Sequence, residues 1–143
     1  MAGLSELVGA ELGPTEWVVM TQDQVDQFAG LSGDHKFIHV DPARAKETPF
    51  GGTIAHGMLS LSLLAPVAKQ LHVSDATTTI NYGFDRVRFP APIPVGGRWR
   101  GAAKIVEVTE IKGGLQVKLA AAVEIDGSER PAVAAECLIR FYA

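Results

Sequence analysis

The densest group of ionisable side chains in this sequence lies within ten residues, at positions 32–41. This segment, Ser-Gly-Asp-His-Lys-Phe-Ile-His-Val-Asp, contains two carboxylates, Asp34 and Asp41, and two of the four histidines, His35 and His39. A carboxylate and an imidazole that meet at one site can take up and release protons near neutral pH. The structural alternative is that both aspartates cap helices and both histidines are exposed loop residues. The spacing alone favours that alternative.

A second candidate segment, Ile54-Ala-His-Gly-Met, opens a long apolar stretch that predicts a helix from about Ala55 to Leu71. The first N–H groups of a helix have no acceptor within it, and the helix dipole favours negative charge there. Gly57 therefore offers an unobstructed donor to an anion or a developing oxyanion. The alternative, equally open, is that Gly57 only permits tight packing and that His56 is a hydrogen-bonded core histidine.

Before residue 76 the sequence predicts helices and loops around one short strand at 17–20. Thr21 and Gln24 have the spacing of a capping box, which predicts a helix from there to about Leu31. Residues 34–40 have no helical period and are expected to form a loop. Asp41-Pro42 has the composition of a new helix start, with the aspartate as cap and the proline at the first position.

After residue 76 the pattern changes to alternating apolar and polar residues, with strands predicted at 77–89, 98–109, 115–125 and 131–141. Gly113-Gly114 and Asp126-Gly127 are expected to be hairpin turns. Apolar side chains occupy every side of the helix that begins near Ala55, and Pro66 should kink or shorten it. The economical architecture is an α+β fold in which an antiparallel sheet of about five strands wraps around this helix. Trp17, Phe50 and Phe84 are residues of a kind found more often in a core than in a tunnel wall, and no role is assigned to them.

The chain of 143 residues has the size of a single domain, spanning 1–143. Its net charge is -3 and its basic residues are scattered, so nucleic acid is not an expected partner. The first twelve residues lack the pattern of a targeting peptide, and the longest apolar region, 54–71, is too interrupted to enter a membrane. A cytoplasmic protein is expected. Cys137 is the only cysteine, which excludes an internal disulfide, and its flanks predict a packing residue on a strand.

Together the two candidate segments resemble the signature of a known family. Gly33-Asp34, four further residues, His39-Val-Asp41 and then Ile54-Ala-His-Gly-Met-Leu59 are similar to the MaoC-like, (R)-specific enoyl-CoA hydratases of the hot-dog superfamily. Ile80-Asn-Tyr-Gly83, Val87-Arg-Phe-Pro-Ala-Pro92 and Val95-Gly96 are similar to that family's second half. The wording Gly-Asp-His-x-x-Ile-His-Val-Asp is closest to a mycobacterial branch. The resemblance covers roughly residues 15–142.

This resemblance implies a single hot-dog domain that works as a homodimer. The implied reaction is reversible (R)-specific hydration of trans-2-enoyl-CoA to (R)-3-hydroxyacyl-CoA in fatty acid metabolism. The family's roles fall on Asp34 and His39 as the catalytic acid/base pair and on Gly57 as the oxyanion donor, with His56 beside it at the substrate. No metal and no cofactor are implied; the substrate is a thioester of CoA or of a carrier protein.

The sequence departs from the family pattern at Lys36-Phe37, where many members have Asn-Pro. A hydroxyl found in some members near Ala65 is also absent, with Ser60 or Ser62 as possible substitutes. Two other functions remain open: a hot-dog acyl thioesterase, and a non-catalytic partner subunit that binds acyl chains. The spacing of Asp34 and His39 favours hydration over thioester hydrolysis, and the presence of Gly57 as well argues against a non-catalytic subunit.

Overall fold

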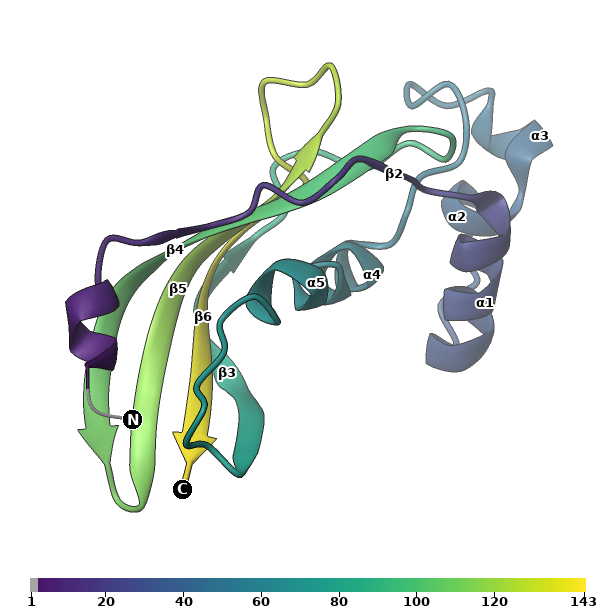
Figure 1. Ribbon diagram of the computed structural model, residues 1–143. Helices are drawn as coiled ribbons and strands as arrows, with labels where there is room; N and C mark the ends of the chain where they lie inside the picture. Colours follow the sequence, from purple (N-terminus) through teal and green to yellow (C-terminus); the bar gives the residue numbers. More distant parts are fainter. Residues whose placement is uncertain (1–2) are drawn as a thin grey trace.

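One curved antiparallel sheet dominates the computed structural model, which describes residues 3–143 (Figure 1). Its long strands are β3 (Thr78–Arg88), β4 (Arg98–Ile111), β5 (Gly114–Ile125) and β6 (Val133–Tyr142). The described strands are arranged in the order β1-β4-β5-β6-β3, and the short β2 (Val18–Val19) also pairs with β4. The four long strands lie within three residues of their predicted bounds, so the predicted α+β sheet is confirmed.

Two short segments add to what the sequence predicted. A 3-10 turn, η1 (Leu4–Leu7), precedes β1 (Glu11–Leu12), and β1 pairs with β4 at the edge of the sheet. The turn after β4 is the predicted one, with Gly113 at a φ of 81°, which a residue with a side chain rarely adopts. The Asp126-Gly127 turn is correct in place, but β6 starts only at Val133, so this connection is longer than a tight hairpin.

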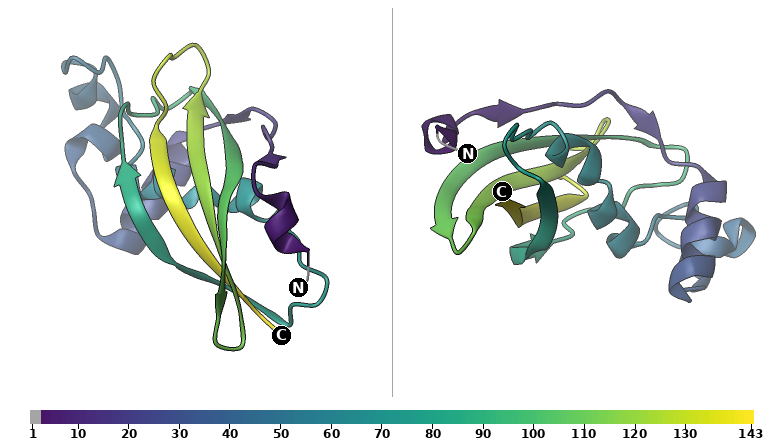
Figure 2. Two further views of the ribbon diagram at one scale, coloured as in Figure 1. Left: turned by 90° about the vertical axis from the view of Figure 1, so that its left-hand side faces the viewer. Right: turned by 60° about the horizontal axis from the view of Figure 1, so that its bottom comes forward.

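The sheet curves around the short central helices (Figures 1 and 2). Buried and less buried side chains alternate along much of β5 and β6, so one face of each strand contributes to the core. The fully buried side chains of these two strands include Val117, Leu119, Val123, Val133 and Phe141. Cys137 belongs to the same layer, and burial raises the pKa of its thiol to about 11. Cys137 is therefore a packing residue, as its flanking sequence predicted.

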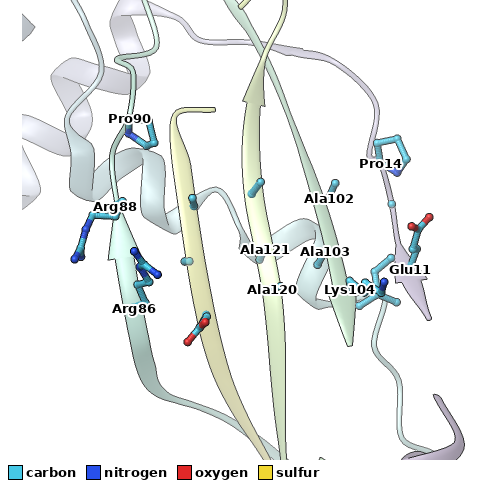
Figure 3. Close-up of a pocket in the computed structure, with 16 residues that line it drawn as sticks. Glu11, Pro14, Arg86, Arg88, Pro90, Ala102, Ala103, Lys104, Ala120 and Ala121 are labelled. Atoms are coloured by element: carbon cyan, nitrogen blue, oxygen red, sulfur yellow. The ribbon is translucent and has the colours of Figure 1, made fainter. Parts of the chain in front are cut away.

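The opposite face of the sheet is lined with small side chains. A shallow hollow of about 680 Å³ lies over the middle of β4, β5 and β6, where alanines form its floor (Figure 3). Arg86 and Arg88 of β3 stand on one side of this hollow, and Glu11 and Lys104 stand on the other. The small side chains are thus confined to the middle of this face, and charged side chains stand at its margins.

The predicted central helix is divided into α4 (Gly57–Ser62) and α5 (Ala65–Ala68). Pro66 lies in the first turn of α5 and has no N–H to donate to the preceding turn, which explains the break. The expectation that this helix is buried on most sides is only partly met within one chain. Leu64 and Val67 are buried against the sheet, whereas Met58 is 63% exposed.

The first long helix, α1 (Gln22–Ser32), forms as the sequence predicted. Thr21 accepts from the Gln24 N–H, and the Gln24 side chain accepts from the Thr21 N–H, which completes the capping box. Val25 and Ala29 are fully buried, but Leu31 is not part of the core. Gly33 ends the helix in the left-handed conformation.

The segment after α1 corrects two expectations. Within the predicted loop at 34–40, α2 (Phe37–Val40) forms one helical turn, followed by α3 (Pro42–Ala45) with Asp41 as its cap. Phe50 and Phe84 are 49% and 44% exposed, so neither is a core residue in this chain. None of the helices between residues 3 and 143 has the length and apolar character that a bilayer crossing requires.

Replacing Thr21 with alanine should lower the free energy of unfolding by about 1 kcal/mol, because the first turn of α1 loses its side-chain acceptor. Urea unfolding followed by circular dichroism measures this change. Thr21→Ser, which keeps the hydroxyl, is the control and should stay close to the wild type. Equal stability of the alanine and serine variants would contradict a role for the cap.

Candidate active site

Asp34 is placed by the end of α1 and by its own short turn. Its N–H donates to the Ser32 hydroxyl at 3.3 Å, and its Oδ1 accepts from the Lys36 N–H at 3.3 Å. The Lys36 ammonium lies 4.0 Å from Oδ2 of the same carboxylate. Asp34 is therefore held by main-chain contacts while its side chain stays partly open to solvent.

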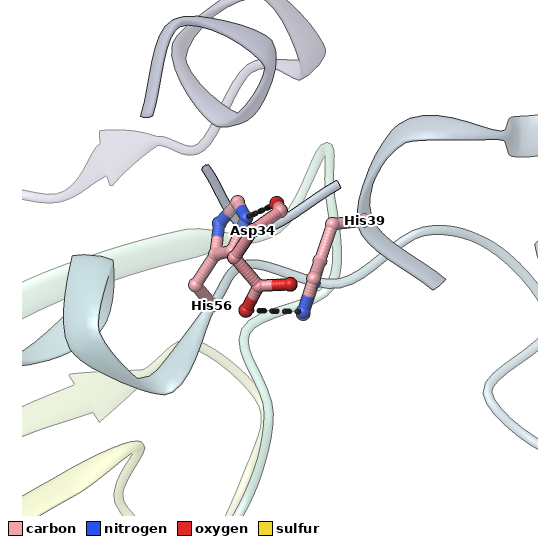
Figure 4. A group of neighbouring side chains, drawn as sticks. All are labelled: Asp34, His39 and His56. Atoms are coloured by element: carbon pink, nitrogen blue, oxygen red, sulfur yellow. Dashed lines mark hydrogen bonds and ion pairs between the residues drawn. The ribbon is translucent and has the colours of Figure 1, made fainter. Parts of the chain in front are cut away.

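His39 lies on α2 with only 6% of its surface exposed. Its Nδ1 lies 2.7 Å from the main-chain oxygen of Ile54. Because a carbonyl oxygen can only accept, Nδ1 carries the hydrogen and Nε2 has a free lone pair. Nε2 faces Oδ2 of Asp34 at 4.0 Å (Figure 4). This separation is too long for a direct hydrogen bond and suits a water molecule that bonds to both atoms.

The main chain around His39 is fixed by residues far away in the sequence. Gln22, at the start of α1, donates to the His39 main-chain oxygen at 2.7 Å and accepts from the Thr53 hydroxyl at 2.5 Å. The Ile54 N–H donates to the main-chain oxygen of Ile38 at 3.0 Å. No sequence pattern indicates a role for Gln22 or Thr53, because their contacts join segments that only the tertiary fold brings together.

His56 contacts the main chain of Asp34 and one face of the His39 ring. It precedes α4, is 2% exposed, and its Nε2 lies 2.9 Å from the Asp34 main-chain oxygen. Its ring stacks on the His39 ring, with centroids 3.9 Å apart and planes inclined by 26°. His56 is not among the residues that line the adjoining cavity.

A cavity of about 210 Å³ adjoins His39 and Gly57. Phe50 and Phe89 form part of its wall, so Phe50 belongs to the site and not to the core. The Ser60 side chain also lines this cavity, whereas Ser62 lies in a separate groove. Of the two serines considered as substitutes, Ser60 is the one at the site, although its hydroxyl already donates to the His56 main-chain oxygen.

Gly57 is the first residue of α4, so this helix provides no acceptor for its N–H. A β-carbon at this position would lie 3.1 Å from the Phe89 ring. Gly57 therefore packs closely against Phe89, and it also lines the cavity. Because α4 has only six residues, its dipole adds less to an oxyanion site than the predicted long helix would.

The environment favours the unprotonated form of both members of the pair. Burial opposes ionisation of Asp34, but the Lys36 N–H, the Lys36 ammonium and the nearby imidazoles together lower the pKa of the Asp34 carboxyl. Burial lowers the pKa of His39, and the hydrogen bond to Ile54 and the charge of Asp34 only partly offset this. At neutral pH the site therefore presents a carboxylate and a neutral imidazole.

The other two ionisable residues of the segment have structural positions. Asp41 accepts from the Arg44 N–H at 3.1 Å and caps α3, and His35 is exposed. The structural alternative therefore holds for Asp41 and His35. Asp34 and His39 instead face each other across 4.0 Å, and His39 lines the cavity.

Asp34, His39 and His56 could also be considered as metal ligands, because one potential ligand atom from each lies within 4.8 Å of the others. A metal ion requires lone pairs that converge on one point. The two rings are stacked, so the lone pairs of their nitrogens lie in nearly parallel planes. This arrangement suits proton transfer better than coordination.

The sequence matches the MaoC-like domain family over residues 4–126, and the chain belongs to this family. It is 43% identical over 145 residues to 3-hydroxyacyl-thioester dehydratase Z of Mycobacterium tuberculosis, covering 100% of this chain and 96% of that protein. An unliganded (R)-hydratase of Pseudomonas aeruginosa superposes with a TM-score of 0.75 at 28% identity, covering 94% and 81% of the two chains. An (R)-hydratase of A. caviae involved in PHA biosynthesis gives 0.73 at 26% identity, covering 92% and 94%. The predicted family and hot-dog fold are confirmed.

The pKa of His39 should lie below the ordinary 6.5, and Asp34→Asn should lower it further, because the variant loses the negative charge that stabilises the imidazolium. Titration of the His39 ring proton by NMR measures both values. A midpoint above 6.5 in the wild type, or a rise in the variant, would contradict the electrostatic description of the site.

Proposed function

We propose that this protein catalyses the reversible, (R)-specific hydration of trans-2-enoyl thioesters to (R)-3-hydroxyacyl thioesters in fatty acid metabolism. The observation that carries this proposal is the Asp34 carboxylate facing the unprotonated Nε2 of His39 at 4.0 Å, beside a cavity that includes Gly57. The enzyme is a hydro-lyase, in agreement with relatives named as a 3-hydroxyacyl-thioester dehydratase and as (R)-hydratases.

The Asp34–His39 pair can hydrate the enoyl thioester with one water molecule and no further reactant. Water bound between the two side chains donates one hydrogen to Asp34 and the other to Nε2 of His39. His39 takes its proton as the water oxygen bonds to C3, and the C2–C3 π electrons move toward the thioester oxygen. His39 then returns the proton to C2, while the hydrogen directed at Asp34 stays on the new hydroxyl. Dehydration is the reverse sequence.

The Gly57 N–H is the proposed donor to the thioester oxygen, which becomes enolate-like when water adds. Loss of one such donor typically costs about 3 kcal/mol of transition-state stabilisation. Phe50 and Phe89 border the same cavity and limit the access of bulk water to it. A site with less water strengthens a single amide-to-oxyanion hydrogen bond.

An apolar groove of about 280 Å³ is the proposed path of the acyl chain. Met58, Leu61 and Ala65 of the central helices form one side, and Phe84 and Ile139 of the sheet form the other. No charged side chain is among the residues that line this groove. Burial of a hydrocarbon chain there would be favourable by about 0.8 kcal/mol per methylene group.

The decisive assay follows the enoyl absorbance of trans-2-enoyl-CoA of several chain lengths while free thiol is monitored in the same sample. Asp34→Asn and His39→Gln should each lower the hydration rate by about 10²-fold or more, because each removes a group that binds or deprotonates the water. Their circular dichroism spectra and melting temperatures should stay near those of the wild type. Full turnover in Asp34→Asn would contradict the assignment.

The same assay separates the alternative functions. Thiol release without formation of the hydrated product would mean a thioesterase. Absence of both signals with CoA thioesters would direct the assay to carrier-protein thioesters, and continued inactivity there would indicate a non-catalytic partner subunit.

The proposed reaction uses no metal, because Asp34 and His39 supply the proton transfer. Dialysis against EDTA should therefore leave the hydration rate within about twofold of the untreated enzyme. A loss of activity that Zn²⁺ restores would contradict this and would direct attention to the lone pairs of Asp34, His39 and His56.

We also propose that the enzyme is a homodimer that pairs along β3. This strand forms one edge of the sheet, and its Ile80, Tyr82 and Phe84 side chains are 45%, 55% and 44% exposed. An edge strand with unpaired main-chain groups and exposed apolar side chains is suited to pairing with a second copy.

Light scattering coupled to gel filtration should give the mass of two chains for the wild type and a lower mass for Ile80→Lys. Val106→Lys on β4 is the matched control, because Val106 has a similar exposed fraction of 40%. A monomeric wild type, or equal dissociation of the two variants, would contradict pairing along β3.

A cytoplasmic location is part of the same proposal. Cys137 is a free, buried thiol, and the chain has no other cysteine. A chain without disulfides is compatible with a reducing compartment, where CoA and carrier-protein thioesters are used.

A further inference from the structure

We propose that His56 is a positioning residue for the hydration reaction: its ring and its Nε2–H hold Asp34 and His39 at the separation where they share one water. This inference rests on the proposed function. It replaces the expectation that His56 contacts the substrate.

The first contact fixes the main chain of Asp34. Nε2 of His56 lies 2.9 Å from the Asp34 main-chain oxygen (Figure 4). Because that oxygen can only accept, Nε2 carries the hydrogen and donates it. The bond spans 22 positions in the sequence and ties the segment after α1 to the start of α4. The Asp34 carboxylate is partly exposed, so its position depends on this main-chain anchor.

The second contact fixes the ring of His39. The two imidazoles are stacked with centroids 3.9 Å apart, and the Phe28 ring lies 4.9 Å from that of His56, inclined by 54°. His56 thus connects α1, through Phe28, with α2, through His39. One face of the His39 ring is covered, and its Nδ1 is bound to Ile54. Nε2 of His39 is left pointing at Asp34.

The remaining nitrogen of His56 shows that this residue does more than fill space. Nδ1 is buried and has no hydrogen-bond partner among the described residues. A buried polar atom without a partner is destabilising, and a phenylalanine at this position would avoid that cost. The donor on the other side of the ring is the property that phenylalanine lacks. The histidine is therefore best explained by its bond to Asp34.

Two variants separate the two contacts. His56→Phe keeps an aromatic ring against His39 but removes the donor to Asp34. His56→Gln keeps an N–H that can reach the Asp34 oxygen but removes the ring. His72→Gln is the control for histidine replacement, because His72 is exposed and does not line the catalytic cavity.

His56→Phe should lower kcat on the order of 10²-fold with little change in KM, because a displaced Asp34 no longer shares the water with His39. His56→Gln should recover much of that loss, and His72→Gln should match the wild type. A KM effect without a kcat effect would overturn the proposal, because it would mean contact with the substrate. Unchanged kcat in His56→Phe with a lower melting temperature would also overturn it, since the residue would then be structural only.

A second measurement does not depend on turnover. The groups that face His39 are Asp34 and Lys36 from the preceding turn and His56 from α4, and each of them contributes to its pKa. Both His56→Phe and His56→Gln lose the His56 contribution, but only His56→Phe also releases Asp34, whose charge raises the pKa of His39. The NMR titration midpoint of His39 should therefore be lower in His56→Phe than in His56→Gln, and unchanged in His72→Gln. Equal midpoints in His56→Phe and His56→Gln would overturn the positioning role. If the wild type has no hydratase activity, the proposed function fails, and this titration still decides whether His56 positions the pair.

His56→Asn is the reserve variant in case the phenylalanine is not accommodated. The asparagine amide is one methylene shorter than that of glutamine and cannot reach the Asp34 oxygen from the same backbone position. His56→Asn should therefore lose kcat while His56→Gln retains it. Equal activity of the asparagine and glutamine variants would contradict the role of the hydrogen bond.

Discussion

The hydrogen bond from His39 Nδ1 to the main-chain oxygen of Ile54 is the interaction on which the rest of the site depends. It decides which ring nitrogen carries the hydrogen, and so makes Nε2 the atom that can accept a proton. The acceptor is rigid because its own segment is bonded on two sides: Ile54 bridges to Pro94, and the Ala55 N–H donates to Ile93. The chain then enters α4 directly, so the same few residues orient the base and deliver the Gly57 amide.

The curved sheet provides this segment with a fixed support. Val67 and Leu64 are packed against its concave face, and Gly101 on β4, which has no side chain, leaves room for Val67 there. A β-carbon on Gly101 would lie 3.1 Å from Val67. The distance between the central helices and the sheet thus depends on Gly101, a residue far from the catalytic pair in sequence. Packing of this kind transmits position across the molecule because protein interiors contain little free volume.

Features that depend on neighbouring residues were predictable from the sequence. The Thr21–Gln24 capping box, the Asp41-Pro42 helix start and the alternation along β5 and β6 are local patterns, and all three formed as expected. The proximity of Asp34 and His39 was also expected, through the family resemblance. The helical turn α2 was missed because four residues are too few to show a period.

Other features of the site depend on contacts between distant segments. Gln22 reaches the His39 main chain only because α1 packs beside α2, and Phe50 lines the cavity only because the fold brings it together with Gly57 and Phe89. Neither residue type indicates such a role. For His56 the sequence left a core position and a place near the oxyanion donor open, and distances in three dimensions were needed to show its contact with Asp34. Burial of Met58 was overestimated because an apolar pattern looks the same for two kinds of surface. One is a surface buried within a single chain, and the other is a surface that only a second chain could cover.

The free edge of β3 also has a consequence for how this protein is made and stored. Near Ile80 the strand is regular, and a chain that has just folded would expose a ready template for adding other strands, including those of unfolded chains. Between Asn81 and Arg86 two register irregularities disturb the edge, and Asp85 and Arg86 add charges to it. The half near Ile80 lacks that protection. Aggregation of newly synthesised or diluted protein would therefore begin at this end of the strand. Pairing of this edge with a second copy would protect it from that aggregation.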